Sequence, residues 1–129
     1  MPSLEGIRVL IVDDDPSTCE AVGIYLRAIG AEVLPAASAA QALEAFPYFK
    51  PHVLVSDIAM PEEDGLSLMR KVRELPRKLG RTPAIALTAF ATAQDVALSM
   101  AAGFQYHLPK PVEANELAKT IARLAKEKP

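Results

Sequence analysis

The hydrophobic positions of the chain form two patterns: short apolar runs, and longer stretches with apolar residues three or four positions apart. The runs are too short for helices and predict strands, whereas a spacing of three and four is the period of a helix. We expect strands over residues 7–12, 32–35, 52–56, 84–88 and 105–108. The helical stripes are Val22, Leu26 and Ile29; Ala39, Ala42, Leu43 and Phe46; Leu68, Met69, Val72 and Leu75; Val96, Met100 and Ala101; Leu117, Ile121 and Leu124.

Residues at the ends of these stretches support the helices. Ser38 and Gln41, like Thr92 and Asp95, have the spacing at which a hydroxyl and an acid or amide satisfy free backbone amides of a first helical turn. Pro16 is suited to the first turn of a helix, because the N–H it lacks would have no partner there.

Strict alternation of strands and helices, with nearly continuous apolar strands, predicts a parallel sheet covered on both faces. The predicted fold is therefore a three-layer α/β sandwich. The first and third strands are the most uniformly apolar, so we expect them to be central. The 129 residues form a single domain, with a core expected over about residues 7–126.

Charge and cysteine content exclude several classes of protein. Fourteen Lys and Arg against sixteen Asp and Glu give a net charge of −2 without a basic arm, which argues against direct nucleic-acid binding. No apolar run approaches the length of a membrane span. The single Cys19 cannot form an internal disulfide and is expected to be inert, so a reducing, cytoplasmic location fits best.

Polar residues collect where the predicted strands end. In an open parallel sheet, ligands bind at the carboxyl ends of the strands, so these side chains are expected to meet at one edge. The residues at that edge are Asp13, Asp14, Asp15, Asp57, Thr88 and Lys110.

This set of side chains suits phosphoryl transfer. Clustered carboxylates repel one another, and a hard cation such as Mg²⁺ relieves the repulsion. Lys110 and Thr88 can supply an ammonium and a hydroxyl to the oxygens of a phosphoryl group on a central carboxylate. The residues therefore predict an aspartate nucleophile with a magnesium ion beside it.

Four ordered motifs make the sequence resemble the response-regulator receiver domain over almost its whole length. They are Val-Leu-Ile-Val-Asp-Asp at 9–14, Asp-Ile-Ala-Met-Pro-Glu-Glu-Asp-Gly at 57–65, Leu-Thr-Ala at 87–89, and Lys-Pro at 110–111. The resemblance implies flavodoxin-like strand order 2-1-3-4-5. It also implies a switch in two-component or phosphorelay signalling that accepts a phosphoryl group from a histidine kinase or phosphotransfer protein and then changes its affinity for a downstream protein.

Carried over by position, the resemblance makes Asp57 the phosphoacceptor and also a metal ligand. Asp14 would bind Mg²⁺ directly, Asp13 through water, and Ala59 through its carbonyl oxygen. Thr88 would be the switching hydroxyl.

The resemblance further makes Lys110 the cation that binds the phosphoryl group, held by a cis peptide bond to Pro111. With Asp57 and Thr88 it would complete the reactive set. The lead-in at residues 4–8 and the histidine at position 107 look like receivers joined to hybrid histidine kinases.

The chain departs from the family pattern at three positions. His107 stands where most receivers carry Tyr or Phe; it is either an ordinary edge-strand residue or a switch residue with a pH dependence. Strand alternation places the preceding Tyr106 on the opposite face. Ala59 and Phe90 flank the position of the attacking water in this family and cannot hold it by a hydrogen bond, so we expect at most slow self-dephosphorylation and no further enzymatic activity.

Other interpretations remain open. Asp15 can simply cap the first helix. The Asp13–Asp15 pair formally matches a haloacid-dehalogenase type phosphohydrolase, although Ser17 stands where that family expects Thr or Val. A receiver-like interaction module that is never phosphorylated is a further alternative. Residues 99–108 would form an output face, and the small apolar residues Ala97, Ala101 and Ala102 suit either docking or ordinary packing.

Overall fold

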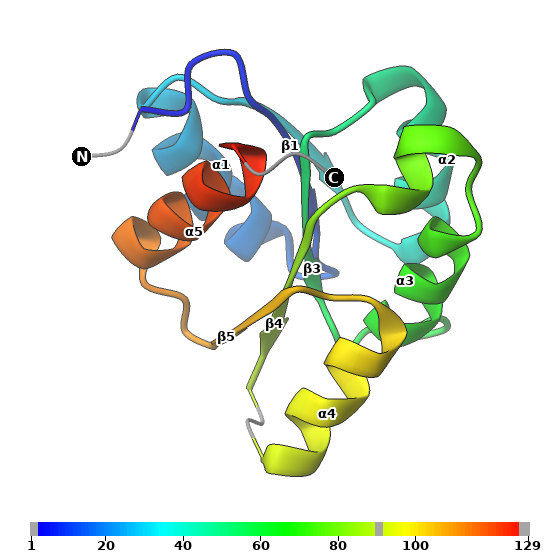
Figure 1. Ribbon diagram of the computed structural model, residues 1–129. Coiled ribbons are helices and arrows are strands. Elements are labelled where there is room, and N and C mark those ends of the chain that lie inside the picture. Colours follow the sequence, from blue (N-terminus) through cyan, green and yellow to red (C-terminus); the bar gives the residue numbers. More distant parts are fainter. Residues whose placement is uncertain (1–2, 90–91, 127–129) are drawn as a thin grey trace.

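The structure is a computed structural model that describes residues 3–89 and 92–126. Its centre is a sheet of five parallel strands in the order β2-β1-β3-β4-β5 (Figure 1). The predicted flavodoxin-like order is confirmed, with the two most apolar strands next to each other inside the sheet. The strands are β1 (Arg8–Val12), β2 (Glu32–Ala36), β3 (Val53–Asp57), β4 (Ala84–Thr88) and β5 (Tyr106–Pro109).

Helices cover both faces of the sheet, which confirms the three-layer sandwich. In Figure 1, α1 and α5 lie on one side, and α2, α3 and α4 on the other. The helices are α1 (Pro16–Ala28), α2 (Ala39–Phe49), α3 (Gly65–Arg73), α4 (Ala93–Ala102) and α5 (Ala114–Lys126), with a short 3₁₀ helix, η1 (Arg77–Arg81), before β4.

The two faces follow from strand alternation, because successive side chains of a strand point in opposite directions. In β1, Val9 and Ile11 belong to the core beneath α1 and α5, whereas Leu10 and Val12 belong to the core beneath α2, α3 and α4. All four side chains are buried. A strand that fills two cores must be apolar throughout, which explains the continuous run.

Capping side chains set the beginnings of four helices. Asp15, Ser38, Asp64 and Thr92 each accept a hydrogen bond from a backbone N–H in the first turn of α1, α2, α3 and α4. The Asp15 cap was one of the open interpretations and is confirmed. Such caps stabilise a helix by about 1 kcal/mol each.

Burial is uneven among the helices. In α5, five residues are buried, whereas in α4 only Ser99 and Ala102 are. On α4, Leu98 and Met100 are 45% and 47% exposed. The helix α4 therefore contributes little to the core and presents apolar side chains to solvent.

Three features go beyond the sequence pattern. The helix η1 lies in a stretch without helical periodicity. The helix α2 continues past Pro47 to Phe49, although Pro47 has no N–H to donate to the carbonyl of the preceding turn. Leu4 is fully buried, and its N–H donates to the Ile29 carbonyl at 2.8 Å, so the core begins before residue 7.

Among the described residues, no helix is both long and apolar enough to cross a bilayer.

Candidate functional site

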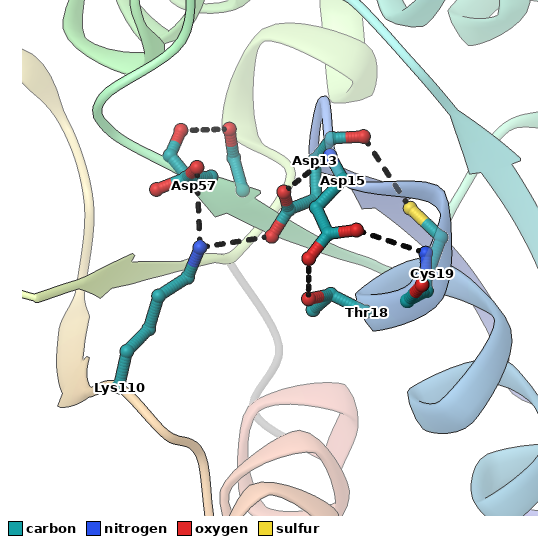
Figure 2. A network of polar contacts seen from close by, with 8 residues as sticks. Asp13, Asp15, Thr18, Cys19, Asp57 and Lys110 are labelled. Atoms are coloured by element: carbon teal, nitrogen blue, oxygen red, sulfur yellow. Dashed lines mark hydrogen bonds and ion pairs between the residues drawn. The ribbon is translucent and has the colours of Figure 1, made fainter.

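The carboxyl ends of four strands bring the predicted site residues to one edge of the sheet. Asp13 follows β1, Asp57 ends β3, Thr88 ends β4 and Lys110 follows β5. Asp13, Asp57 and Thr88 are buried, with 1%, 5% and 8% of their surface exposed. Parallel strands placed in this order therefore collect acids, a hydroxyl and an ammonium at one edge of the sheet. Figure 2 shows Asp13, Asp57 and Lys110 at this edge.

Lys110 lies between two of the acids. Its Nζ is 3.0 Å from Asp13 Oδ2 and 3.2 Å from Asp57 Oδ2. Figure 2 shows the lysine side chain reaching from the β5 end toward both carboxylates. One ammonium thus offsets the repulsion between two acids that water screens poorly.

Burial and neighbours shift the pKa of Asp57 in opposite directions. Desolvation is the largest cause and raises the pKa above its usual value; the charge of Asp13 adds to this. The Lys110 ammonium and the backbone of Ala59 act the other way without cancelling the rise. The Asp57 carboxylate is therefore a more basic oxygen nucleophile than an exposed aspartate.

The same pair of acids controls the protonation of Lys110. Burial alone would lower the pKa of its ammonium, but the hydrogen bonds and charges of Asp13 and Asp57 outweigh that effect and raise the pKa. Lys110 is therefore held as a fixed positive charge beside the Asp57 carboxylate.

The acids of this edge suit a hard cation. Asp13, Asp14 and Asp57 each offer a carboxylate oxygen, and these oxygens lie within 4.8 Å of one another. Asp14 is exposed, and within the described ranges no cation pairs with it. Oxygen donors with one open, solvent-facing acid are the ligands that Mg²⁺ prefers, because it keeps several of its waters. The residues present therefore fit the predicted ion.

The Asp13 carboxylate is positioned by its own loop. Its Oδ1 accepts from the backbone N–H of Asp15 at 2.9 Å, and its carbonyl accepts from Cys19 Sγ at 3.5 Å. Desolvation raises the pKa of the Cys19 thiol, and the charge of Asp13 adds to the rise. Since the thiolate is the reactive form, this supports the prediction that Cys19 is inert.

The remaining site residues lie around the same edge. The Lys110 N–H donates to the Thr88 carbonyl at 2.9 Å, and the peptide bond from Lys110 to Pro111 is cis, as the resemblance implied. Ala59 is exposed, and with Thr88 it lines a small cavity of about 110 Å³ against α4. Phe90 lies outside the described residues.

Gly65 has a role at the site that the sequence pattern does not predict. A Cβ at this position would collide with the Asp57 carbonyl oxygen, and the Gly65 N–H donates to the Ile58 carbonyl at 2.8 Å. Only glycine lets the first turn of α3 lie this close to the backbone of Asp57. The sequence feature that could have indicated this role is the glycine directly after the Asp64 cap, at the first position of α3.

His107 has an unusual environment. Its Nε2 is buried and has no hydrogen-bond partner among the described residues. Tyr106 packs against the core of α1 and α5, so alternation directs His107 to the face that α4 covers. A buried polar atom without a partner costs about 1–3 kcal/mol.

Comparison with known proteins identifies the family. Residues 9–122 match the response regulator receiver domain. This match covers most of the chain, and the chain belongs to the receiver-domain family of two-component signalling proteins.

Individual relatives agree with this. The chain is 43% identical to an uncharacterized 14.6 kDa protein of Leptolyngbya boryana, with 94% of this chain and 92% of the relative covered. It is 36% identical to the transcriptional regulatory protein TrcR of Mycobacterium tuberculosis and 32% identical to hybrid signal transduction histidine kinase D of Dictyostelium discoideum. The matches cover 92% and 94% of this chain, but only 44% of TrcR and 8% of the kinase.

Solved structures have the same fold. The chemotaxis protein CheY4 of Vibrio cholerae is 30% identical with a TM-score of 0.85, covering 92% of this chain and 98% of CheY4. The receiver domain of a histidine kinase from Syntrophus aciditrophicus is 28% identical with a TM-score of 0.85, covering 96% of each chain.

Proposed function

We propose that this chain is a phosphorylation-dependent switch whose phosphoacceptor is Asp57. The observation that carries the proposal is the position of Lys110, whose ammonium lies within 3.2 Å of both the Asp57 and Asp13 carboxylates. Such a cation can bind the oxygens of a phosphoryl group on Asp57, where it would otherwise meet only negative charge.

The transfer we propose uses a phosphohistidine donor. An Asp57 oxygen forms a bond to phosphorus, the P–N bond of the donor breaks, and the leaving imidazole takes up a proton. The product is an acyl phosphate on Asp57. The raised pKa of Asp57 supports its role as the attacking oxygen.

Asp13, Asp14, Asp57 and the carbonyl of Ala59 would hold Mg²⁺, which supplies positive charge to the phosphoryl oxygens. The close approach of the three carboxylates supports this set. The protein itself supplies a further positive charge to the phosphoryl oxygens, that of the Lys110 ammonium.

The switch itself is proposed to involve Thr88 and His107. A phosphoryl group adds a charge of roughly −1.5 to −2, and the hydroxyl of Thr88 is a donor at the end of the neighbouring strand. The Nε2 of His107 has no hydrogen-bond partner in the part of the chain that the structure describes, which supports a second packing of the α4 side in which that atom finds a partner. Exposed Leu98 and Met100 on α4 support a partner surface there.

The donor is proposed to be a histidine kinase or phosphotransfer protein, and the downstream target a protein. Slow self-dephosphorylation remains a prediction that rests on the residue types at Ala59 and Phe90. A cytoplasmic location also remains a prediction. The phosphohydrolase alternative gains no support, because the Asp15 carboxylate accepts from Ser17 N–H and Thr18 Oγ1 as a helix cap.

The test is an intact-mass spectrum after incubation with phosphoramidate, a small P–N phosphodonor, with and without Mg²⁺. We expect one phosphoryl adduct that needs Mg²⁺ and is absent from Asp57→Asn. Asp15→Asn is the matched control, since it removes a neighbouring acid that serves only as a cap, and it should still be labelled.

An Asp57→Asn variant that is labelled like the wild type would refute the assignment of Asp57. A folded wild type that takes no phosphoryl group from phosphoramidate or from a panel of phosphohistidine donors would favour the interaction module that is never phosphorylated.

A further inference from the structure

A second hollow opens at the opposite end of the sheet from Asp57. It has a volume of about 1070 Å³ and lies between the start of β1, the loop that joins α2 to β3, and η1 before β4. Because the strands are parallel, these segments meet at the amino ends of the strands, toward the top of Figure 1. The receiver chemistry of the other edge does not use them.

The hollow is strongly basic. Five of its ten lining residues are Arg or Lys, and none is Asp or Glu. Across residues 3–89 and 92–126, no carboxylate forms an ion pair with any of the five. The chain as a whole has a net charge of −2, so this is a local concentration of positive charge against the balance of the molecule. The basic residues are Arg8, Lys50, Arg77, Lys78 and Arg81.

Part of this basic surface is held in place by the backbone. Arg8 Nε donates to the carbonyls of Phe49 and Lys50 at 2.9 and 3.0 Å, and the Arg8 N–H donates to His52 Nδ1 at 2.9 Å. Since Nδ1 accepts, a neutral His52 carries its proton on Nε2 as a further donor. A fixed arrangement of donors costs less entropy when a ligand binds.

The rest of the lining is apolar. Pro51, Pro76 and Leu79 contribute hydrocarbon surface beside the cations. Small-molecule sites have volumes of roughly 300–1000 Å³ and combine apolar walls with a few polar groups. Arg side chains also stack on flat rings and bind phosphate in a forked geometry.

We propose that this hollow binds a nucleotide-sized phosphorylated ligand, with its phosphates on the Arg77, Lys78 and Arg81 side and a flat ring against the proline and leucine walls. The combination of a hollow of about 1070 Å³, apolar surface and cations that pair with no carboxylate in the described ranges favours a small ligand over an acidic polypeptide segment. The proposal is independent of phosphorylation at Asp57.

The test follows backbone amide shifts by NMR during titration with ATP, pyrophosphate and adenosine. EDTA is present, so that no metal links phosphate to the aspartates of the other edge. We expect saturable shifts at residues 50, 52 and 77–82 with a dissociation constant for ATP of about 100 µM or tighter at physiological salt. Pyrophosphate should bind about tenfold more weakly and adenosine weakest, since each lacks one part of the ligand.

Charge reversal should remove the binding. Lys78→Glu with Arg81→Glu is expected to weaken ATP binding at least tenfold, because both side chains are exposed and make no hydrogen bond within the described residues that folding would need. Lys119→Glu on the exposed face of α5 is the matched control and should change binding less than twofold. Asp57→Asn should bind as the wild type does.

Three results would overturn the proposal. Shifts confined to residues around Asp57 and Lys110 would place phosphate at the other edge. Linear shifts without saturation would indicate only non-specific attraction. Tighter binding of a polyglutamate peptide than of ATP would identify an acidic protein segment as the occupant.

Discussion

Lys110 and Asp13 are 97 positions apart in the sequence, yet Lys110 Nζ lies 3.0 Å from Asp13 Oδ2. The same nitrogen is 3.2 Å from Asp57 Oδ2, so a single cation bridges the first and third strands of the sheet. Asp13 and Asp57 are both far from Lys110 in the sequence. Only the strand order β2-β1-β3-β4-β5 brings the three groups together.

Asp57→Asn is expected to stabilise the fold at neutral pH when Mg²⁺ is absent. Burial raises the pKa of Asp57 in the folded state, so the folded protein holds that proton more tightly than the unfolded chain does. Stability is then lost as the pH rises from the usual pKa of an aspartate through the raised one. Removing the charge should therefore raise the melting temperature at pH 7.

The measurement is thermal unfolding in EDTA as a function of pH. The gain should shrink as the pH falls below the titration range of Asp57, where the wild type is neutral too. Asp15→Asn serves as the control, since asparagine also caps a helix and the replaced carboxylate is exposed, so stability should change little. A gain for Asp57→Asn that persists unchanged at acid pH would contradict the electrostatic explanation.

Gly65→Ala is expected to destabilise the protein by about 2 kcal/mol, in the range of overpacked positions. The new methyl group would collide with the Asp57 carbonyl and push α3 away from the end of β3. Urea unfolding measures the loss, and labelling by phosphoramidate should fall with it because Asp57 is displaced.

Gly23→Ala is the matched control in α1. It is also buried, but a Cβ there would meet mainly the end of the flexible Arg27 side chain at 3.2 Å. Helix propensity favours alanine over glycine by about 1 kcal/mol, so this variant should be neutral or stabilised. Equal losses in both variants would show that the contact with Asp57 is not the cause.

The sequence was sufficient for the sheet and for most of the site, for a physical reason. Polar or charged residues stand at the ends of four of the apolar strands, and in a parallel sheet all such ends lie on one edge. The strand pattern alone therefore predicts that Asp13, Asp57 and Lys110 meet. The alternation of Tyr106 and His107 followed from the pleat in the same way.

Two features could not be predicted from the same pattern. The helix η1 has no apolar period and depends on contacts from elsewhere in the fold. The basic hollow gathers Arg8, Lys50 and Arg81 from three separate segments at the amino ends of the strands. The sequence around each segment does not show that η1 lies beside the amino ends of the strands, because the position of η1 depends on the path of the chain before β4.

Arg73→Met is expected to cost about 2–4 kcal/mol of stability without abolishing labelling of Asp57. Arg73 Nη1 donates to the carbonyls of Thr82 and Gly80 at 2.7 and 3.1 Å, and its Nε donates to Gly103 at 3.2 Å. It therefore joins α3 to the segment before β4 and to the end of α4. Denaturant unfolding gives the loss.

Arg73→Lys is the informative partner variant. Lysine keeps the charge but cannot reach three carbonyls with a planar fork, so it should recover only part of the lost stability. Full recovery by lysine would show that charge alone, and not the forked geometry, is what matters at this position.

The two histidines of the chain should respond to phenylalanine with opposite signs. His107→Phe removes a buried Nε2 that has no partner in the described part of the chain, and should stabilise by about 1 kcal/mol. His52→Phe removes the acceptor of the Arg8 N–H at 2.9 Å, and should destabilise by a similar amount. The melting temperatures of the two variants at one pH test this prediction. A change in the same direction for both variants would contradict it.

The shallow packing of α4, with only Ser99 and Ala102 buried, has a consequence for hydrogen exchange. An amide exchanges when its segment opens, and segments with few buried contacts open at a small fraction of the global unfolding free energy. The amides of α4 should therefore exchange with deuterium well before those of α5. The helix beside His107 would then be the first cooperative unit to leave the native state, while the sheet beneath it stays intact.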